Sequence, residues 1–217
     1  MPKEVVLVKQ IELAQAKVHL IGTSPLMVHK FPEKSKRQMR DKQQKKVSGP
    51  KEIRNPWEDA ILSTYWLAGE PTEYTEAAFQ EAVAGGARFG FPATGVKVSA
   101  CSGAYRNKLS KDKTSLYGAF HIIGDELVEI FGKPDVREDI VTLGMATKDL
   151  RYRVWFRQWE TRFDIIFNSA IITLEQILSY FEAGGFAVGI GEYRIEKGGV
   201  FGSYRVAADG EVMEEVV

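Results

Sequence analysis

The alternation of hydrophobic and polar residues predicts several β-strands. Residues 16–22 place Val18 and Leu20 on one face. The clearest alternation covers residues 159–167, where the odd positions are mainly aromatic or aliphatic and the even positions include Glu160, Arg162 and Asp164. Residues 116–123 and 127–131 flank Gly124-Asp125-Glu126 and predict a hairpin, and residues 200–206 predict a closing strand.

Helical spacing of apolar residues predicts helices over residues 56–69, 76–84, 96–106 and from Leu174 onward. Pro56 occupies a first-turn position, and Thr173 with Gln176 forms a capping box before the last helix. Gly184-Gly185 is expected to end that helix, and residues 88–95 to form an aromatic loop. Residues 135–143 fit no single state. This order predicts one α+β domain over residues 1–217, compatible with a ferredoxin-like βαββαβ core.

Residues 184–206 contain seven glycines among apolar, aromatic and basic residues. Such a backbone can adopt positive φ and approach a polymer closely, while neighbouring aromatic and basic side chains offer stacking and charge. A dinucleotide-binding loop is excluded because Arg194 stands at the third glycine position, and no Gly-Lys-Ser/Thr follows for a phosphate-binding loop. No cofactor is expected. A glycine-rich hairpin between two strands is an equally good interpretation.

Residues 30–54 form a basic insertion, with ten basic against three acidic residues and a local charge of +7. The segment has few apolar residues after Met39, so it is either a solvated helix or an arm that becomes ordered on a partner. Its lysine and glutamine content, followed by Ser48-Gly49-Pro50, favours a flexible extension. An ordinary solvated surface loop is the alternative.

The whole chain balances 29 basic with 29 acidic residues, so any anion-binding surface must be local. Three basic clusters, over residues 30–54, 106–113 and 151–157, could neutralise phosphates, and aromatic residues beside them could stack on bases. The candidate nucleic-acid-binding residues are Lys30, Lys34, Lys36, Arg37, Arg40, Lys42, Lys45, Lys46, Lys108, Lys111, Arg151, Arg153, Tyr193, Arg194, Lys197 and Phe201. The candidate loop glycines are Gly189, Gly191, Gly198, Gly199 and Gly202.

Few residues suggest chemistry. His19 and His121 lie in apolar strand patterns typical of structural residues, whereas His29 adjoins the basic insertion and is the one candidate for a catalytic base. No histidine pair or carboxylate cluster has metal-ligand spacing, so no metal is expected. Cys101 is a lone cysteine, expected to be packed, and its isolation excludes an internal disulfide.

The first 17 residues mix charged residues with short apolar runs, so we expect no secretory leader. No stretch approaches the roughly 20 apolar residues of a membrane span. These features predict a cytoplasmic protein without membrane partners.

Gly189-Ile190-Gly191 and Gly198-Gly199-Val200-Phe201-Gly202, between a capped helix and a closing strand, resemble the C-terminal signature of the RAMP superfamily of CRISPR RNA-binding proteins. Residues 20–26 also resemble the first strand and turn of its backbone subunits, which polymerise along a guide strand. The resemblance implies a ferredoxin-like domain whose glycine loop touches RNA backbone, with residues 30–54 where those subunits carry a thumb or finger. The chain also resembles small phage and prophage replication or recombination proteins, for which single-stranded DNA would be the ligand. The two resemblances imply a bacterial cell or a phage-infected cell.

The sequence therefore predicts a non-catalytic protein that binds single-stranded DNA or RNA and forms a homo-oligomer or filament along it. One alternative is an endoribonuclease of the RAMP type using His29. Another is a protein-interaction or virion-associated module, in which the basic insertion docks a partner.

Overall fold

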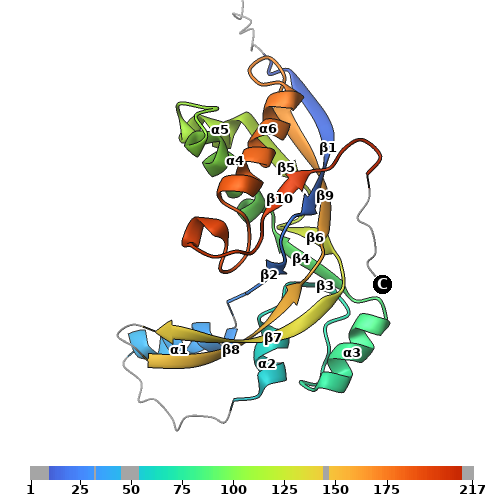
Figure 1. The fold of residues 1–217 in the computed structure, drawn as a ribbon, viewed down its shortest axis with the longest axis vertical. Helices are drawn as coiled ribbons and strands as arrows, with labels where there is room; N and C mark the ends of the chain where they lie inside the picture. Colours follow the sequence, from blue (N-terminus) through green and yellow to red (C-terminus); the bar gives the residue numbers. More distant parts are fainter. Residues whose placement is uncertain (1–9, 32, 45–53, 144–146, 212–217) are drawn as a thin grey trace, which may run out of the picture.

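The computed structural model describes residues 10–31, 33–44, 54–143 and 147–211 (Figure 1). Within these ranges the protein is a mixed α+β structure with six α-helices and two antiparallel sheets. The strands are β1 (Leu13–Gly22), β2 (Leu26–Met27), β3 (Trp66–Ala68), β4 (Arg88–Pro92), β5 (Phe120–Ile123), β6 (Leu127–Phe131), β7 (Pro134–Leu143), β8 (Thr147–Phe156), β9 (Glu160–Asn168) and β10 (Tyr204–Val206). The helices are α1 (Glu33–Gln43), α2 (Pro56–Leu62), α3 (Glu76–Ala84), α4 (Ala93–Arg106), α5 (Lys113–Ala119) and α6 (Leu174–Ala187), with a 3₁₀ turn, η1 (Ile195–Lys197).

The larger sheet has the strand order β10-β1-β9-β6-β4-β3, and β5 also pairs with β9. The predicted alternation of β9 is confirmed, because Thr161, Phe163, Ile165 and Phe167 are all buried. Helices α4 and α6 pack against each other over one face of this sheet (Figure 1). The core therefore lies between these two helices and the β1-β9 centre.

The smaller sheet joins β2 to a long hairpin, β7-β8, that extends from one end of the molecule (Figure 1). Residues 135–143, for which the sequence indicates no single state, belong to its first strand. One face of the hairpin packs on α2 through Val154 and Phe156, which are buried. The other face is turned toward the glycine-rich loop, so the hairpin can contribute side chains to a shared surface.

Two predicted elements are wrong in extent and one is wrong in type. Helix α2 ends at Leu62 rather than Gly69, because the hydroxyls of Ser63 and Thr64 both bond the Ala60 carbonyl and the chain then enters β3. The predicted closing strand 200–206 is limited to β10. The predicted aromatic loop 88–95 is strand β4 followed directly by α4.

The predicted hairpin of residues 116–123 and 127–131 is also wrong. Residues 113–119 form α5, and β5 and β6 pair with successive parts of β9 instead of with each other. Gly124 does adopt a positive φ of 110°, so the turn residue exists, but β6 pairs on its other side with β4. Tertiary pairing outweighs the local turn signal here.

Gly184-Gly185 does not end the last helix, which continues to Ala187. A side chain at Gly184 would overlap the backbone of Ala100 in α4, and one at Gly185 would overlap the carbonyl of Tyr204 in β10. These glycines therefore let α6 approach its neighbours closely, while the Thr173 capping box starts the helix as predicted.

We predict that Gly185→Ala lowers the free energy of unfolding by about 1–3 kcal/mol or more, since its methyl group meets backbone that cannot yield. Gly118→Ala in α5 is the matched control: its added methyl group meets nothing within 4 Å, so it should be neutral or stabilising by up to about 1 kcal/mol. Urea unfolding of both variants tests this, and equal stabilities would contradict the packing role.

Candidate nucleic-acid interface

The glycine loop, defined as residues 188–203 between α6 and β10, is closed by its own backbone. The amide of Ile190 donates to the Gly202 carbonyl at 2.9 Å, and the amide of Gly199 donates to the Arg194 carbonyl at 3.1 Å. Two further bonds attach the loop to the β2 region, from Glu192 N to Met27 O at 2.9 Å and from Gly202 N to Pro25 O at 2.7 Å. The loop is thus fixed between the core and the base of the hairpin.

Most of the predicted loop glycines serve this closure. Gly189, Gly191, Gly198 and Gly202 have positive φ, and a side chain at Gly199 or Gly202 would overlap a carbonyl of the loop itself, that of Tyr193 or Ile190. Among these five glycines, only Gly198 would leave an added side chain in open space. The glycines therefore build the loop, and the surface that it offers consists of its side chains.

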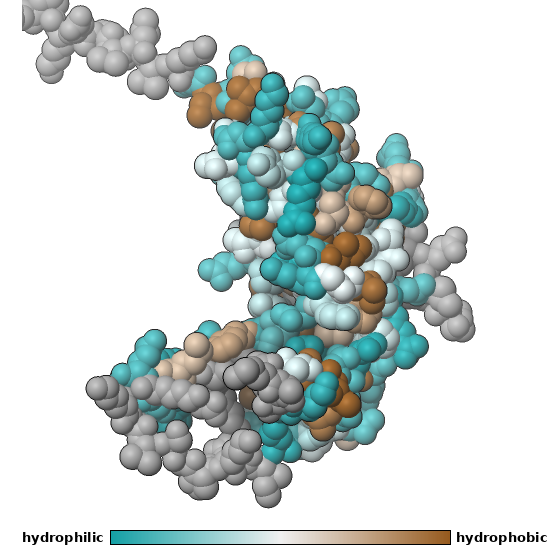
Figure 2. Space-filling model, turned by 60° about the vertical axis from the view of Figure 1, so that its left-hand side comes forward, coloured by the Kyte–Doolittle hydropathy of each residue, from teal (hydrophilic) through white to brown (hydrophobic). Residues whose placement is uncertain are grey.

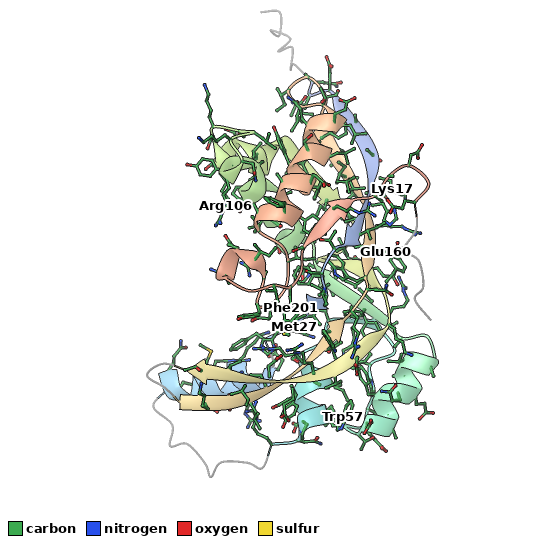
Figure 3. The ribbon with its side chains drawn as sticks, viewed as in Figure 1. Lys17, Met27, Trp57, Arg106, Glu160 and Phe201 are labelled. Atoms are coloured by element: carbon green, nitrogen blue, oxygen red, sulfur yellow. The ribbon has the colours of Figure 1, made fainter. Side chains whose placement is uncertain are left out.

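A cluster of rings and guanidinium groups joins this loop to the hairpin. The arginine–aromatic cluster consists of Arg137, Trp155, Arg157, Tyr193 and Phe201. Arg137 lies over the rings of Trp155 and Phe201 at 5.2 and 5.3 Å, and Arg157 lies 5.0 Å from the Trp155 ring centre. Phe201 contacts Tyr193 with ring centres 6.0 Å apart. Figure 3 shows Phe201 and Met27 where the hairpin meets the rest of the molecule.

Exposure differs sharply within the cluster. Tyr193 is 58% exposed with φ of 50°, whereas Phe201 is only 9% exposed. The side chain of Arg157 is 72% exposed. Tyr193 and Arg157 can therefore contact a ligand, while Phe201, predicted as a stacking residue, supports Tyr193 and Trp155 from beneath.

The cluster lies on a hollowed side of the molecule. In the space-filling view the surface is hollowed between the main body and the hairpin arm (Figure 2). Arg151, Arg153 and Trp155 occupy every second position of β8, so their side chains lie on the same face of the hairpin. Arg153 is largely buried, and its guanidinium reaches the Met27 sulfur at 3.6 Å.

The hairpin cations are already paired with carboxylates. Arg151 lies 2.9 Å from Asp149, Arg137 lies 2.7 Å from Asp139, and Arg157 lies 3.8 Å from Asp135. In contrast, Lys108, Lys111 and Lys197 have no ion pair with any residue in the described part of the chain. Arg106 bonds Glu196 at 2.6 Å and so holds η1, with Lys197, against the end of α4.

Several buried polar atoms near the base of the hairpin have no hydrogen-bond partner among the residues that the structure describes. They include His29 Nδ1, Arg153 Nε and Trp155 Nε1. Buried polar atoms are nearly always bonded, so this concentration marks a site that can accept further polar contacts. Burial, followed by the charge of Arg153, lowers the pKa of His29 below its ordinary value, which keeps the imidazole neutral at pH 7.

A pocket of about 220 Å³ opens beside His29, between the glycine loop and the start of α4. We call it the loop pocket; its walls include His29, Tyr65, Phe91, Val98, Glu192 and Arg194. Burial, then the charge of Glu192, raises the pKa of the Tyr65 hydroxyl, so it stays protonated. Burial acts to raise the pKa of Glu196, but bonding to Arg194 and the charges of Arg194 and Arg106 lower it overall.

Within the basic insertion, residues 33–43 form helix α1, which agrees with the solvated-helix alternative and not with the favoured flexible extension over these residues. Its ends are fixed: Lys30 N donates to the Ser63 carbonyl at 2.6 Å, and Arg54 bonds both Asp149 and the Leu150 carbonyl at 2.8 Å. Lys36, Arg37 and Arg40 are exposed, and both Lys36 and Arg40 pair with Glu33. Lys45 and Lys46 lie outside the described residues, and the side chains of Lys34 and Lys42 are likewise not described.

The remaining titratable candidates have structural surroundings. His19 bonds the buried Glu160 at 3.0 Å, and His121 lies 3.2 Å from Lys97. Cys101 is fully buried, as predicted, and burial raises its thiol pKa to about 11. Among the described residues no group of three or more His, Cys, Asp or Glu is arranged to hold a metal ion.

The structure brings together Arg151, Arg153, Tyr193, Arg194 and Phe201 where the hairpin meets the glycine loop. Sequence reasoning missed Arg137, Tyr65 and Glu192. Arg137 falls in the stretch to which no state was assigned, and only its pairing opposite Arg153 brings it to the cluster. Tyr65 and Glu192 carry no local signal, because they meet only through the tertiary fold.

Comparison of the sequence with protein-family models and with curated proteins found no match. No helix in the described ranges is long and apolar enough to cross a membrane.

The lowered pKa of His29 predicts the direction in which the stability of the protein changes with pH. In the unfolded chain histidine binds its proton near pH 6.5, before native His29 does, so the stability of the wild type falls as pH drops through about 6.5. His29→Gln removes this contribution. The stability difference between wild type and His29→Gln, from urea unfolding, should therefore shift against the wild type between about pH 7.5 and 5.5. Parallel pH profiles would contradict it.

Proposed function

We propose that this protein binds single-stranded nucleic acid without chemistry, through the hollowed side between the glycine loop and the hairpin. The observation that carries the proposal is the arginine–aromatic cluster, in which Tyr193 and Arg157 are exposed and are supported by buried or half-buried rings. Aromatic side chains stack on bases of any sequence, and arginine adds cation–π contact. Because Tyr193 and Arg157 are exposed, core packing does not account for their side chains, and contact with a ligand does.

The charges around the cluster favour weak and reversible binding of the nucleic-acid backbone. Exposed ion pairs such as Arg157–Asp135 contribute only about 0–1 kcal/mol, so a phosphate can replace the carboxylate. Lys108, Lys111 and Lys197, which form no ion pair within the described part of the chain, can neutralise further phosphates. Binding should therefore weaken steeply with salt, because the basic side chains release cations that are condensed on the phosphates of the free strand.

The arrangement of the core supports the more specific proposal of a ferredoxin-like domain. Counting β1, α4, β5, β9, α6 and β10 gives the order βαββαβ, and the strand order β10-β1-β9-β5 with both helices on one face suits that fold. The glycine loop lies between the last helix and the last strand, in keeping with the RAMP resemblance. On that resemblance we also propose that copies assemble along the strand.

The nucleic acid could be phage single-stranded DNA or a guide RNA, and both polymers belong in the test. An endoribonuclease is the competing function, favoured by His29, whose neutral imidazole lines the loop pocket. Incubation of end-labelled RNA with wild type and His29→Ala decides between them. We expect intact RNA in both reactions; cleavage that disappears in His29→Ala would replace the binding proposal with catalysis.

We predict that Tyr193→Ala weakens single-strand binding by about 1–3 kcal/mol, or roughly 5- to 150-fold, with little change in salt dependence, because one stacking ring is lost. Arg157→Ala should instead reduce the slope of log affinity against log salt by about one. Fluorescence anisotropy with labelled single-stranded DNA, single-stranded RNA and duplex across a salt series measures both effects.

Tyr74→Ala is the matched control, since Tyr74 is another exposed tyrosine but precedes α3, outside the cluster. It should bind as the wild type does. Wild-type affinity weaker than about 10⁻⁴ M for every ligand at physiological salt would exclude the proposed function and favour a protein-interaction or virion-associated module.

A further inference from the structure

The loop pocket is too small for an extended ligand but suits one flat ring system. Its volume of about 220 Å³ is below the roughly 300–1,000 Å³ of sites for drug-sized ligands. Tyr65 and Phe91 form an aromatic wall, with ring centres 6.2 Å apart and their planes at 67°. Val98 on α4 is 43% exposed and borders the pocket.

The charge of the pocket excludes a phosphate. Its walls carry two carboxylates, Glu192 and Glu196, against one cation, Arg194. That cation is already committed, because Arg194 bonds Glu196 at 2.8 Å and the Gly191 carbonyl at 3.3 Å. The matching ligand is therefore uncharged and presents N–H donors, which describes the edge of a nucleobase and not the strand backbone.

Two polar groups are positioned to recognise such an edge. Glu192 is half-buried, and its carboxylate accepts no hydrogen bond from any residue that the structure describes. Its charge is close enough to influence the pKa of both His29 and Tyr65. His29 Nδ1 is buried without a partner among the described residues. Carboxylates accept hydrogen bonds from exocyclic amino groups such as cytosine N4.

The pocket adjoins the stacking surface. Glu192 and Arg194, which line the pocket, flank Tyr193 in the chain, so the exposed Tyr193 ring belongs to the same short segment as the pocket wall. We propose that the loop pocket receives one base turned out of the bound strand and prefers a base with an exocyclic amino group. This inference rests on the proposed function, because the strand must first occupy the cluster.

The test compares binding of labelled oligo-rC and oligo-rU, and repeats it with oligo-dC and oligo-dT. Cytosine has an amino group at ring position 4 and an unprotonated N3, whereas uracil has a carbonyl group at position 4 and an N3–H. We expect the wild type to bind the cytosine strand about tenfold more tightly, the usual size of one good base contact. Glu192→Gln should reduce this ratio to about one or invert it.

Val98→Trp tests the pocket without disturbing the core, since Val98 is already largely accessible. The larger ring should fill the entrance and weaken oligo-rC binding several-fold, with the salt slope unchanged. Val98→Ala and Glu175→Gln, the latter on an exposed residue in the first turn of α6, are matched controls that should keep the wild-type ratio.

The outcomes separate the two proposals. If the wild type binds neither strand, the proposed function itself fails. If it binds both strands equally, and Glu192→Gln and Val98→Trp leave both affinities unchanged, the pocket takes no base and only the further inference is overturned.

Discussion

The attachment of the glycine loop to the β2 region is the contact on which the surface depends. Two backbone hydrogen bonds, Glu192 N to Met27 O and Gly202 N to Pro25 O, connect a loop after the last helix to a segment after the first strand. Because β2 in turn pairs with β8, the same segment carries the hairpin. The loop, the hairpin and the core thus share one junction, and Arg137, Trp155 and Phe201 meet there.

This junction combines rigid and exchangeable interactions. Buried rings and loop glycines fix its geometry, since a side chain at Gly199 or Gly202 would overlap backbone carbonyls. The Arg157–Asp135 ion pair beside it is exposed and contributes little to stability, whereas the pairs of Arg137, Arg151 and Arg153 are partly buried. Such an arrangement can exchange carboxylates for phosphates while its stacking platform stays in place, which is the physical basis of the binding proposal.

Local signals predicted much of the core. The alternation of β9, the Thr173 cap and the extent of α3 are each determined by residues close in sequence, and the structure confirms them. Local sequence signals gave wrong predictions where contacts between distant parts of the chain determine the structure. Gly184-Gly185 resembles a helix stop but permits close packing on Ala100 and Tyr204. Arg151, Tyr193 and Arg194 could be predicted from the local composition and the glycine motif. In contrast, Arg137, Tyr65 and Glu192 reach the site only through tertiary pairing.

The central proposal is that a single strand lies along the junction of loop and hairpin. Photo-crosslinking of wild-type protein to strands carrying 4-thiouridine or 4-thiothymidine, followed by mass spectrometry of the linked peptides, tests it most directly. We expect crosslinks in the peptides containing Trp155 and Tyr193. Crosslinks confined to the opposite face of the large sheet, around Lys17, His121 and Phe131, would contradict it.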